Sequence, residues 1–162
     1  ALQDGGVLFY QNERVGYRGT KITVLKFRSM SGTDVGVEAL KSKLKVTPVG
    51  RVLRKSRIDE FPQLWNIVKG DLSLIGPRPE LPALTDEYAR QIPQYHLRHI
   101  VKPGLSGWAQ IYHDAHPHHG TDIDATRIKL AYDLYYIKHR SFALDLMIAL
   151  KTIRTLLTLA GR

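Results

Sequence analysis

The stretch SRIDEFPQLWNIVKGDLSLIGPRPE, residues 56–80, joins two adjacent acids to an apolar repeat and a Gly-Pro-Arg-Pro turn. Asp59 and Pro62 both satisfy the rules for entering a helix. The apolar residues that follow have helical spacing: Phe61, Leu64, Trp65 and Val68. We therefore predict a helix that starts near Asp59 and ends at the Lys-Gly-Asp run of residues 69–71, with Trp65 as a packing residue.

Two runs rich in proline and glycine are predicted to be irregular. The first, SLIGPRPELP at 73–82, contains three prolines and fixes Arg78 between two of them. Proline donates no backbone hydrogen bond and restricts the residue before it, so regular structure is disfavoured here. The second, KPGLSGWAQ at 102–110, is predicted to be a turn-rich loop that leads into a polar, irregular segment.

Upstream of the opening stretch, the sequence favours a β-hairpin. Residues 7–11 and 22–27 are rich in β-forming residues and flank a turn-prone run at 12–20 that contains Gly16 and Gly19. A short basic helix is predicted after Pro48, because apolar residues recur on one side of it and cations surround the other.

Downstream, the pattern is mainly helical. We predict helices at 83–99 on either side of Pro93, at 123–138, and at 141–161, where an apolar helix is interrupted by charges. The predicted apolar face of the 123–138 helix consists of Ile128, Ala131, Leu134 and Tyr135. Residues 1–162 are thus expected to form one α+β domain, mostly helical, with an N-terminal hairpin. Its final helix is apolar enough for a core or a membrane surface.

Composition points to an anionic partner. The 162 residues carry a formal net charge of +9, contain no cysteine and are 43% apolar, which suits a globular domain without disulfides or thiolate metal sites. The stretch of residues 41–57 contains no acid and seven cations: Lys41, Lys43, Lys45, Arg51, Arg54, Lys55 and Arg57. Nucleic acid, an anionic membrane surface and a phosphorylated small molecule all remain candidates, and so does a solvated basic face without a partner.

No apolar run approaches the roughly 20 residues that a membrane-spanning helix needs. The chain begins with Ala1 and reaches a strand-like run almost at once. We therefore expect a fragment from which a preceding segment has been removed.

Asp59 and Glu60 allow two interpretations. As a helix cap, Asp59 would accept backbone N–H bonds, and Glu60 would favour the positive end of the helix dipole. Alternatively, a carboxylate held ionised at a helix N-terminus can bind a hard cation such as Mg²⁺ or attack phosphorus. The second interpretation requires nearby cations that neutralise phosphoryl charge, and the sequence offers Lys26, Arg28, Arg51, Arg54, Arg57 and Arg78.

Three motifs in order extend this second interpretation: KFRSM at 26–30, TPVGRVLRKSRIDEFPQLWNIVKGDLSLIGPRPE at 47–80 and VKPGLSGWAQI at 101–111. Together they resemble the bacterial sugar transferase family, the monotopic phosphoglycosyl transferases. The resemblance runs from about Gly5 to the C-terminal helix. It implies transfer of a sugar 1-phosphate from a nucleotide diphosphate sugar, such as a UDP-sugar, to a polyprenyl (undecaprenyl) phosphate. UMP is released, and assembly of an exopolysaccharide or other surface glycan begins.

The resemblance also implies roles for individual residues. Asp59 matches the family's phosphate-attacking carboxylate and Mg²⁺ ligand, and Glu60 is its dyad partner and second metal ligand. Residues implied in substrate binding are Lys26 and Arg28 of the KFR stretch, Arg57, Gln63, Arg78 of the Pro-Arg-Pro turn, and Asp133 in KLAYD. A covalent phosphosugar on Asp59 would form in one displacement and pass to the lipid phosphate in a second.

The same resemblance implies a site on the cytoplasmic face of the bacterial inner membrane, in a monotopic protein. Family members carry a membrane-inserted helix just before the position of Gly5, and we expect this chain to be a fragment without it. The basic block and the final amphipathic helix would hold the domain against anionic lipid. The sugar, the glycan pathway and the oligomeric state, with a homodimer among the options, cannot be predicted from the motifs.

Other interpretations stay open beside the enzyme. A membrane-surface or nucleic-acid binding module would explain the charge, although no zinc finger or RNA-recognition signature occurs and nucleic acid is not our expected partner. The imidazoles of His113, His116, His118 and His119 could bind zinc, but Pro117 and the lack of ordered spacing favour a polar loop. Trp108 is predicted to be a packing residue.

Overall fold

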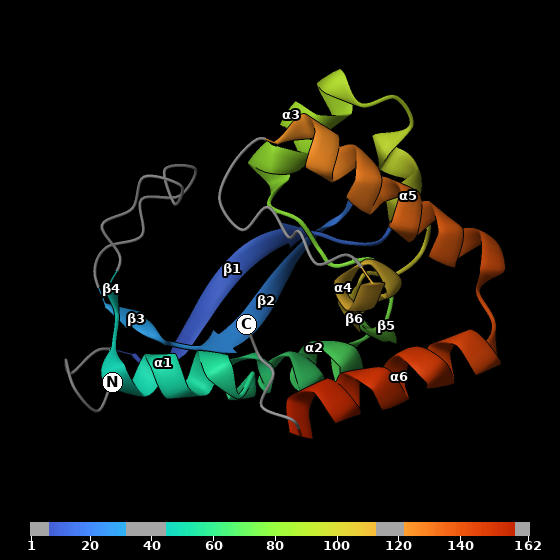
Figure 1. Cartoon of the computed structure of the whole chain (residues 1–162). Coiled ribbons are helices and arrows are strands. Elements are labelled where there is room, and N and C mark those ends of the chain that lie inside the picture. The colour runs from blue at the N-terminus through green and yellow to red at the C-terminus, as the bar shows by residue number, and fades with distance from the viewer. Residues whose placement is uncertain (1–6, 32–44, 113–121, 158–162) are drawn as a thin grey trace.

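A computed structural model describes residues 7–31, 45–112 and 122–157. As predicted, the fold is α+β and mostly helical with an N-terminal antiparallel hairpin (Figure 1). The hairpin pairs β1 (Phe9–Val15) with β2 (Lys21–Phe27), so that Phe9 lies opposite Phe27. The predicted turn at 12–20 was too long: β1 continues to Val15, and only Gly16–Thr20 connect the strands.

The basic helix predicted after Pro48 is confirmed as α1 (Pro48–Lys55). Thr47 caps it, since its hydroxyl accepts the Gly50 N–H at 2.9 Å. Short strands β3 (Met30–Ser31) and β4 (Lys45–Val46) pair antiparallel just before it. Gly50 packs directly on the backbone of Ser29, where a Cβ would lie 1.8 Å from the carbonyl oxygen. Only glycine allows α1 to approach the end of the hairpin this closely.

The helix predicted from Asp59 begins later than expected. Residues Ile58–Glu60 form a 3-10 turn entered through Arg57 in the left-handed region (φ 57°), and α2 spans Gln63–Lys69. Gly70 ends α2 with φ 84°, which confirms the predicted stop.

The inward side of α2 is polar and its apolar side faces outward. Asn66 is 1% exposed because its amide binds the free edge of β2: Nδ2 donates to the Thr23 carbonyl at 2.7 Å, and Oδ1 accepts the Leu25 N–H at 3.1 Å. The predicted apolar repeat is 47–76% exposed, at Phe61, Leu64, Trp65 and Val68. The prediction of Trp65 as a packing residue was therefore wrong.

Both runs predicted to be irregular contain a short strand. β5 (Ser73–Ile75) pairs in parallel with β6 (Gly104–Ser106), and α4 (Trp108–Tyr112) follows at once. The pairing needs glycine on both sides, because a Cβ on Gly104 would lie 2.1 Å from the Gly76 nitrogen. Irregular backbone remains at 76–81 in the first run, and at 102–103 and Gly107 in the second.

The remaining helices are α3 (Pro82–Gln91), the 3-10 helix Tyr95–Ile100, α5 (Ile123–His139) and α6 (Phe142–Leu157). Helical structure on both sides of Pro93 is confirmed. On α5 the predicted face was wrong in part: Ile128, Ala131 and Tyr135 are exposed. Its buried residues are Thr126, Leu130, Asp133 and Tyr136. This side of α5 faces inward because Asp133 forms a buried ion pair with Arg98.

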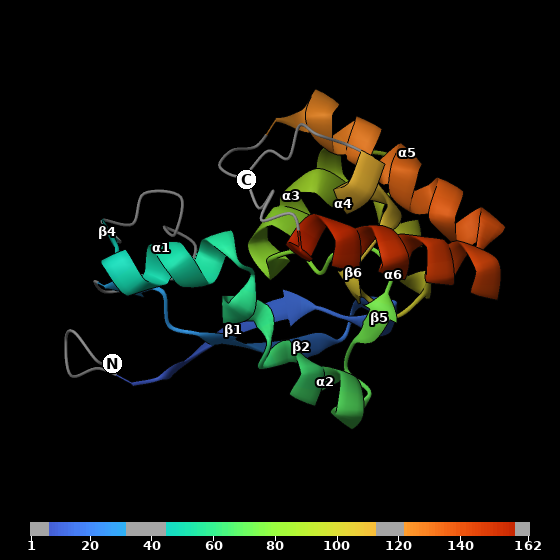
Figure 2. The same cartoon turned by 60° about the horizontal axis from the view of Figure 1, so that its bottom comes forward.

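Two apolar clusters support the site. One joins α3, the 3-10 helix and α5 through Tyr88, Ile92, Tyr95 and Leu130. The other joins β5, α5 and α6 through Ile75, Tyr136 and Ile148, with Trp108 packed against it as predicted. In Figure 1, α3 and α5 lie above the hairpin, and α1, α2 and α6 lie along the opposite side. Turning the molecule brings that side forward (Figure 2).

Among the described helices, none combines the length and the apolar character that crossing a bilayer would require. The four histidines considered as a zinc site, His113, His116, His118 and His119, lie outside the described residues.

Candidate active site

Asp59 and Glu60 are both buried, at 8% exposure, in the turn between α1 and α2. Glu60 is ion-paired twice: its Oε1 accepts the Lys26 ammonium at 2.8 Å, and its carboxylate also binds the Arg78 guanidinium. Asp59, by contrast, has a buried Oδ1 without a hydrogen-bond partner. A buried oxygen of this kind is expensive to leave unpaired and is typical of a functional site.

The helix-cap interpretation of Asp59 was wrong. Neither the 3-10 turn nor α2 has a side-chain cap, and the first turn of α2 contains no acid. Because α2 starts at Gln63, the Asp59 carboxylate is not used in holding a helix terminus. That leaves its oxygens available to a ligand.

The two acids differ in their electrostatic environment. Burial alone would raise the pKa of Glu60, but Arg78 and Lys26 outweigh it and lower that pKa far below its ordinary value. Burial raises the pKa of Asp59, helped by the Glu60 charge and opposed by Lys26, Arg54 and Arg57. We had expected Asp59 to be the acid held ionised; in the structure Glu60 is the acid whose ionised form its cationic partners favour.

A small polar cavity lies beside this pair. It is lined by Arg14, Val24, Lys26, Gln63, Arg78 and Pro79. Gln63 is 3% exposed and its Nε2, a hydrogen-bond donor, is buried without a partner. Burial and the nearby Arg78 charge lower the pKa of Lys26, while Glu60 raises the pKa of Arg78. The cavity therefore combines cations with an unused amide donor, which suits an anionic ligand.

Most of the predicted site residues come together here. Lys26, Gln63 and Arg78 line the cavity next to Glu60, and Arg57 is near enough to lower the pKa of Asp59. Arg28 lies just beyond β2, where its Nε donates to the Met30 carbonyl at 3.1 Å. Asp133 lies in the interior at 2% exposure, bound to Arg98.

Three charged residues near the site were missed by the sequence reasoning: Arg14, Glu80 and Arg98. Glu80 ends the quoted Pro-Arg-Pro-Glu motif and could have been singled out there. Arg14 lies in the run taken for a turn, and Arg98 belongs to no motif. For Arg14 and Arg98, nothing in the local sequence indicates that the fold brings them close to Arg78.

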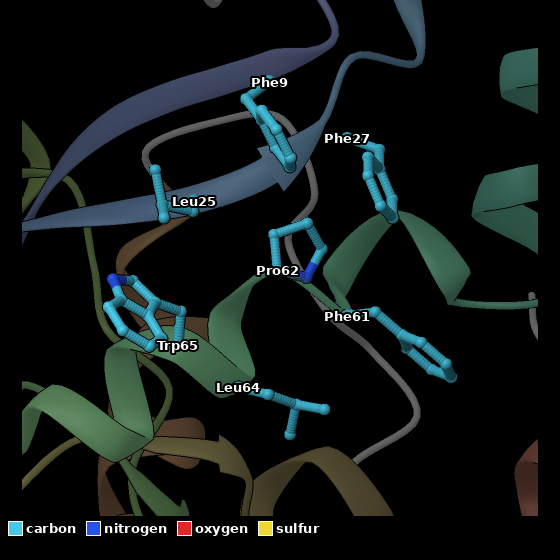
Figure 3. Close-up of a pocket in the computed structure, with 7 residues that line it drawn as sticks. All are labelled: Phe9, Leu25, Phe27, Phe61, Pro62, Leu64 and Trp65. Carbon is cyan, nitrogen blue, oxygen red and sulfur yellow. The ribbon is translucent and has the colours of Figure 1, made fainter.

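An apolar groove of about 550 Å³ lies next to the polar cavity (Figure 3). It is lined by Phe9, Leu25, Phe27, Phe61, Pro62, Leu64 and Trp65. Leu25 and Phe27 flank Lys26 on β2 and point to the opposite face of the strand, because successive strand residues alternate. Pro62 separates the groove from Gln63 of the cavity. One strand and one turn thus carry an apolar surface and a cationic one.

The described residues contain no group of three or more acids or histidines that could hold a metal ion. Both Glu60 oxygens are engaged by cations, whereas Asp59 retains a free oxygen. A cation that takes one carboxylate and completes its shell with substrate phosphates and water, as Mg²⁺ does, fits this donor set.

The site places cations and an unused amide donor beside an apolar groove, an arrangement that suits an anionic ligand with an apolar part. Comparison with known proteins gives the family: residues 1–159 match the bacterial sugar transferase family, to which this chain belongs.

Curated relatives cover nearly the whole chain. A UDP-N-acetylgalactosamine-undecaprenyl-phosphate N-acetylgalactosaminephosphotransferase from Aeromonas hydrophila is 50% identical over 95% of this chain and 36% of its own length. The sugar transferase EpsL of Bacillus subtilis is 39% identical over 99% of this chain and 75% of its own length. A UDP-glucose:undecaprenyl-phosphate glucose-1-phosphate transferase from Caulobacter vibrioides is 40% identical over 97% of this chain and 59% of its own length. The chain thus spans little more than a third of the Aeromonas protein.

Proposed function

We propose that this chain is the catalytic domain of a polyprenyl-phosphate sugar-1-phosphate transferase. It moves a sugar 1-phosphate from a UDP-sugar to undecaprenyl phosphate and releases UMP, as the first step in assembling a surface polysaccharide. The observation that carries the proposal is the unpartnered, buried Asp59 oxygen beside a Glu60 that is fixed by Lys26 and Arg78. The relatives from Aeromonas and Caulobacter, named for this reaction with N-acetylgalactosamine and glucose, support it.

In the first displacement, a carboxylate oxygen of Asp59 attacks the sugar-bearing phosphorus. The bond from that phosphorus to the oxygen bridging the two phosphates breaks, and UMP leaves with the electron pair. An acyl phosphate that carries the sugar remains on Asp59. Lys26 and Arg78 stabilise charge on the phosphoryl oxygens, and the buried Gln63 amide offers one more donor.

In the second displacement, a phosphate oxygen of the lipid attacks the same phosphorus. The bond to the Asp59 oxygen breaks, the carboxylate is restored, and the polyprenyl diphosphate sugar leaves. One set of cations serves both steps, because the leaving group of the first and the nucleophile of the second are both phosphates. Glu60 keeps those cations in place without competing as a nucleophile, since both its oxygens are bound.

Mg²⁺ is the metal that this site would take. Asp59 would hold it, together with the diphosphate, and the ion would supply charge neutralisation for the leaving UMP. Glu60, also predicted as a ligand, would need to release a cation before it could coordinate.

A lipid acceptor agrees with the apolar groove and the outward apolar face of α2. A polyprenyl phosphate combines an anionic head with an apolar tail, and this part of the molecule offers cations and apolar surface side by side. The domain would work at the cytoplasmic face of a bacterial membrane, where the tail need not leave the bilayer.

The test uses membranes that contain the full-length protein, Mg²⁺, undecaprenyl phosphate and a panel of UDP-sugars that includes UDP-N-acetylgalactosamine and UDP-glucose. We expect UMP release with at least one sugar, and loss of release in Asp59→Asn. Asp124→Asn, which changes an acid with an 89% exposed side chain, is the matched control and should keep wild-type activity.

Donor labelled in the sugar phosphate, given without lipid, should label the wild-type protein and not Asp59→Asn. No UMP release with any donor would overturn the proposal. Undiminished release by Asp59→Asn would overturn the covalent mechanism. A protein that binds vesicles but never turns over would instead be a membrane-surface module.

A further inference from the structure

The carbonyl of Arg78 is held from the interior by a second arginine. Arg98, 2% exposed, donates from Nη2 to the Arg78 carbonyl oxygen at 2.9 Å. Its Nε donates to Asp133 Oδ2 at 3.0 Å, and its Nη1 donates to the Tyr95 hydroxyl at 2.8 Å. The Arg98 guanidinium therefore ties the Arg78 turn to α5 and to the 3-10 helix.

Asp133 fixes this guanidinium. Its Oδ2 also lies 2.8 Å from Arg98 Nη2, and it is 2% exposed, so both partners are shielded from water. Glu80, at the end of the same turn, binds Lys129 of α5 at 2.8 Å. Two residues of α5, one turn of helix apart, are thus connected to the turn: Lys129 directly through Glu80, and Asp133 through Arg98.

The rest of the turn is tied down as firmly. Gly76 N–H donates to the Ser106 carbonyl at 2.8 Å, and the Pro77 carbonyl accepts Gly104 N–H at 3.0 Å. The Glu80 carbonyl accepts Val15 N–H at 2.9 Å. Pro77 and Pro79 have no backbone N–H, so the turn has fewer groups that can form hydrogen bonds. The Arg78 carbonyl is one of those that remain.

Arg98 acts on the site through Arg78. Arg98 holds the backbone of Arg78, and the side chain of Arg78 binds Glu60 beside Asp59. A guanidinium suits the first position, because its planar fork donates in several fixed directions at once, which a lysine ammonium on a flexible stem does not.

We propose that Arg98 and Asp133 are positioning residues that set the Arg78 guanidinium for phosphoryl transfer. The proposal rests on the proposed function and deepens it. It gives Asp133 a role through Arg98 and Arg78, in place of the direct substrate contact implied by the family resemblance. Of these three residues, only Arg78 lines the polar cavity beside Glu60.

The test measures kcat and KM for UMP release in membranes that contain the full-length protein. Arg98→Lys keeps a positive charge opposite Asp133 but loses the fork. We expect kcat to fall by about 100-fold, the effect of misplacing a charge by about 1 Å. KM for the UDP-sugar should change far less, because Lys26 and Gln63 still line the cavity.

A second variant keeps the proposal testable if the single change disturbs folding. Arg98→Met combined with Asp133→Leu removes both charges, so no unpaired charge is left buried, and such exchanges often preserve stability. It should fold and still lose kcat. Tyr95→Phe is the conservative control: it removes one Arg98 hydrogen bond, leaves the bond to the Arg78 carbonyl, and should retain near wild-type kcat.

Tyr136→Phe controls for stability alone. Tyr136 also lies on α5, and the change removes its 2.7 Å hydrogen bond to Asp145 of α6 and a longer one, 3.4 Å, to the Ile75 carbonyl of β5. It leaves the Arg98 bonds to Asp133 and to the Arg78 carbonyl in place, so it should lower the melting temperature but not kcat. Wild-type kcat in a folded Met/Leu double variant would overturn the positioning role while the transferase stands. Absence of UMP release by the wild type would overturn the transferase itself, and the positioning role with it.

Discussion

At the scale of single residues, Asp59 and Glu60 show how adjacent acids acquire different properties. Glu60 has two cationic partners, whereas Asp59 has an oxygen that is buried and unpaired. The first arrangement stabilises a charge. The second leaves a buried carboxylate oxygen without a partner, which destabilises the fold but keeps that oxygen free for a substrate. Functional sites commonly carry such local penalties.

Replacing Asp59 should therefore stabilise the folded protein. Burial and the Glu60 charge raise the pKa of Asp59, so its ionisation at neutral pH opposes folding. We expect Asp59→Asn to raise the unfolding free energy by about 1 kcal/mol at neutral pH, measured by urea denaturation with a chelator present. The gain should vanish at pH values below the ordinary pKa of aspartate, where both states of the wild type bind the proton. A less stable variant at neutral pH would contradict this.

His99 should make stability fall with acidification. Burial lowers the pKa of His99 to about 4, with Arg98 and His96 contributing, and its Nε2 is buried without a partner. Between the ordinary value of 6.5 and this value, the unfolded chain binds a proton that the folded chain does not. The unfolding free energy should thus drop over this interval by a few kcal/mol, at about 1.4 kcal/mol per pKa unit. In His99→Gln, urea denaturation should show a flatter pH dependence; an unchanged slope would contradict the assignment.

At the scale of elements, one amide fixes how α2 meets the hairpin. Asn66 satisfies the Thr23 carbonyl and the Leu25 N–H at the free edge of β2. Asn66→Leu leaves both groups without their partner, each worth about 1–3 kcal/mol, so we expect a loss of roughly 2–5 kcal/mol in chemical denaturation. Val68→Ala, on the exposed side of α2, should change stability by no more than about 0.5 kcal/mol. Equal losses in the two variants would falsify this account of α2.

The same element explains where prediction from sequence succeeded and failed. Gly70 predicted where α2 ends, and the spacing of the apolar residues predicted that the segment is a helix, because both signals are local. Which side of α2 faces inward depends on the strand edge that Asn66 meets, and that contact links residues more than 40 positions apart. The apolar period alone predicted the wrong inward side.

The site divides in the same way. Asp59, Glu60 and Arg78 lie within or next to recognisable motifs, and the structure brings them together. The family resemblance pointed to Asp133 as a substrate-binding residue, and no motif pointed to Arg98. The structure shows both in the packing of α5 against the Arg78 turn. Long-range charge pairs leave no local pattern, so the pairing of Asp133 with Arg98 could not be predicted.

At the scale of the whole molecule, apolar side chains gather on the helices of one side. α1, α2 and α6 lie along the lower side in Figure 1 and carry large exposed residues. Those on α1 and α2 are Val49, Val52, Leu64, Trp65 and Val68, and those on α6 are Phe142, Leu146, Met147, Leu150 and Ile153. α1 also bears exposed cations: Arg51, Arg54 and Lys55. Such a surface combines the two attractions that hold a protein to an anionic membrane.

The 162-residue chain should therefore float with vesicles that contain acidic phospholipid, and salt should weaken this binding only in part. At about 1 M salt the screening length falls to about 3 Å, which removes the attraction of the cations but leaves the apolar contribution. The double variant Leu64→Gln/Trp65→Gln should float less than the wild type at low salt, and the difference should be largest at high salt. Ile128→Gln changes an aliphatic residue of similar exposure, 51%, on α5, a helix on the other side of the hairpin in Figure 1, and should float as the wild type does. If high salt released the wild type entirely, or if Ile128→Gln weakened flotation as much as the α2 double variant, the apolar side of α2 would have no role in membrane binding.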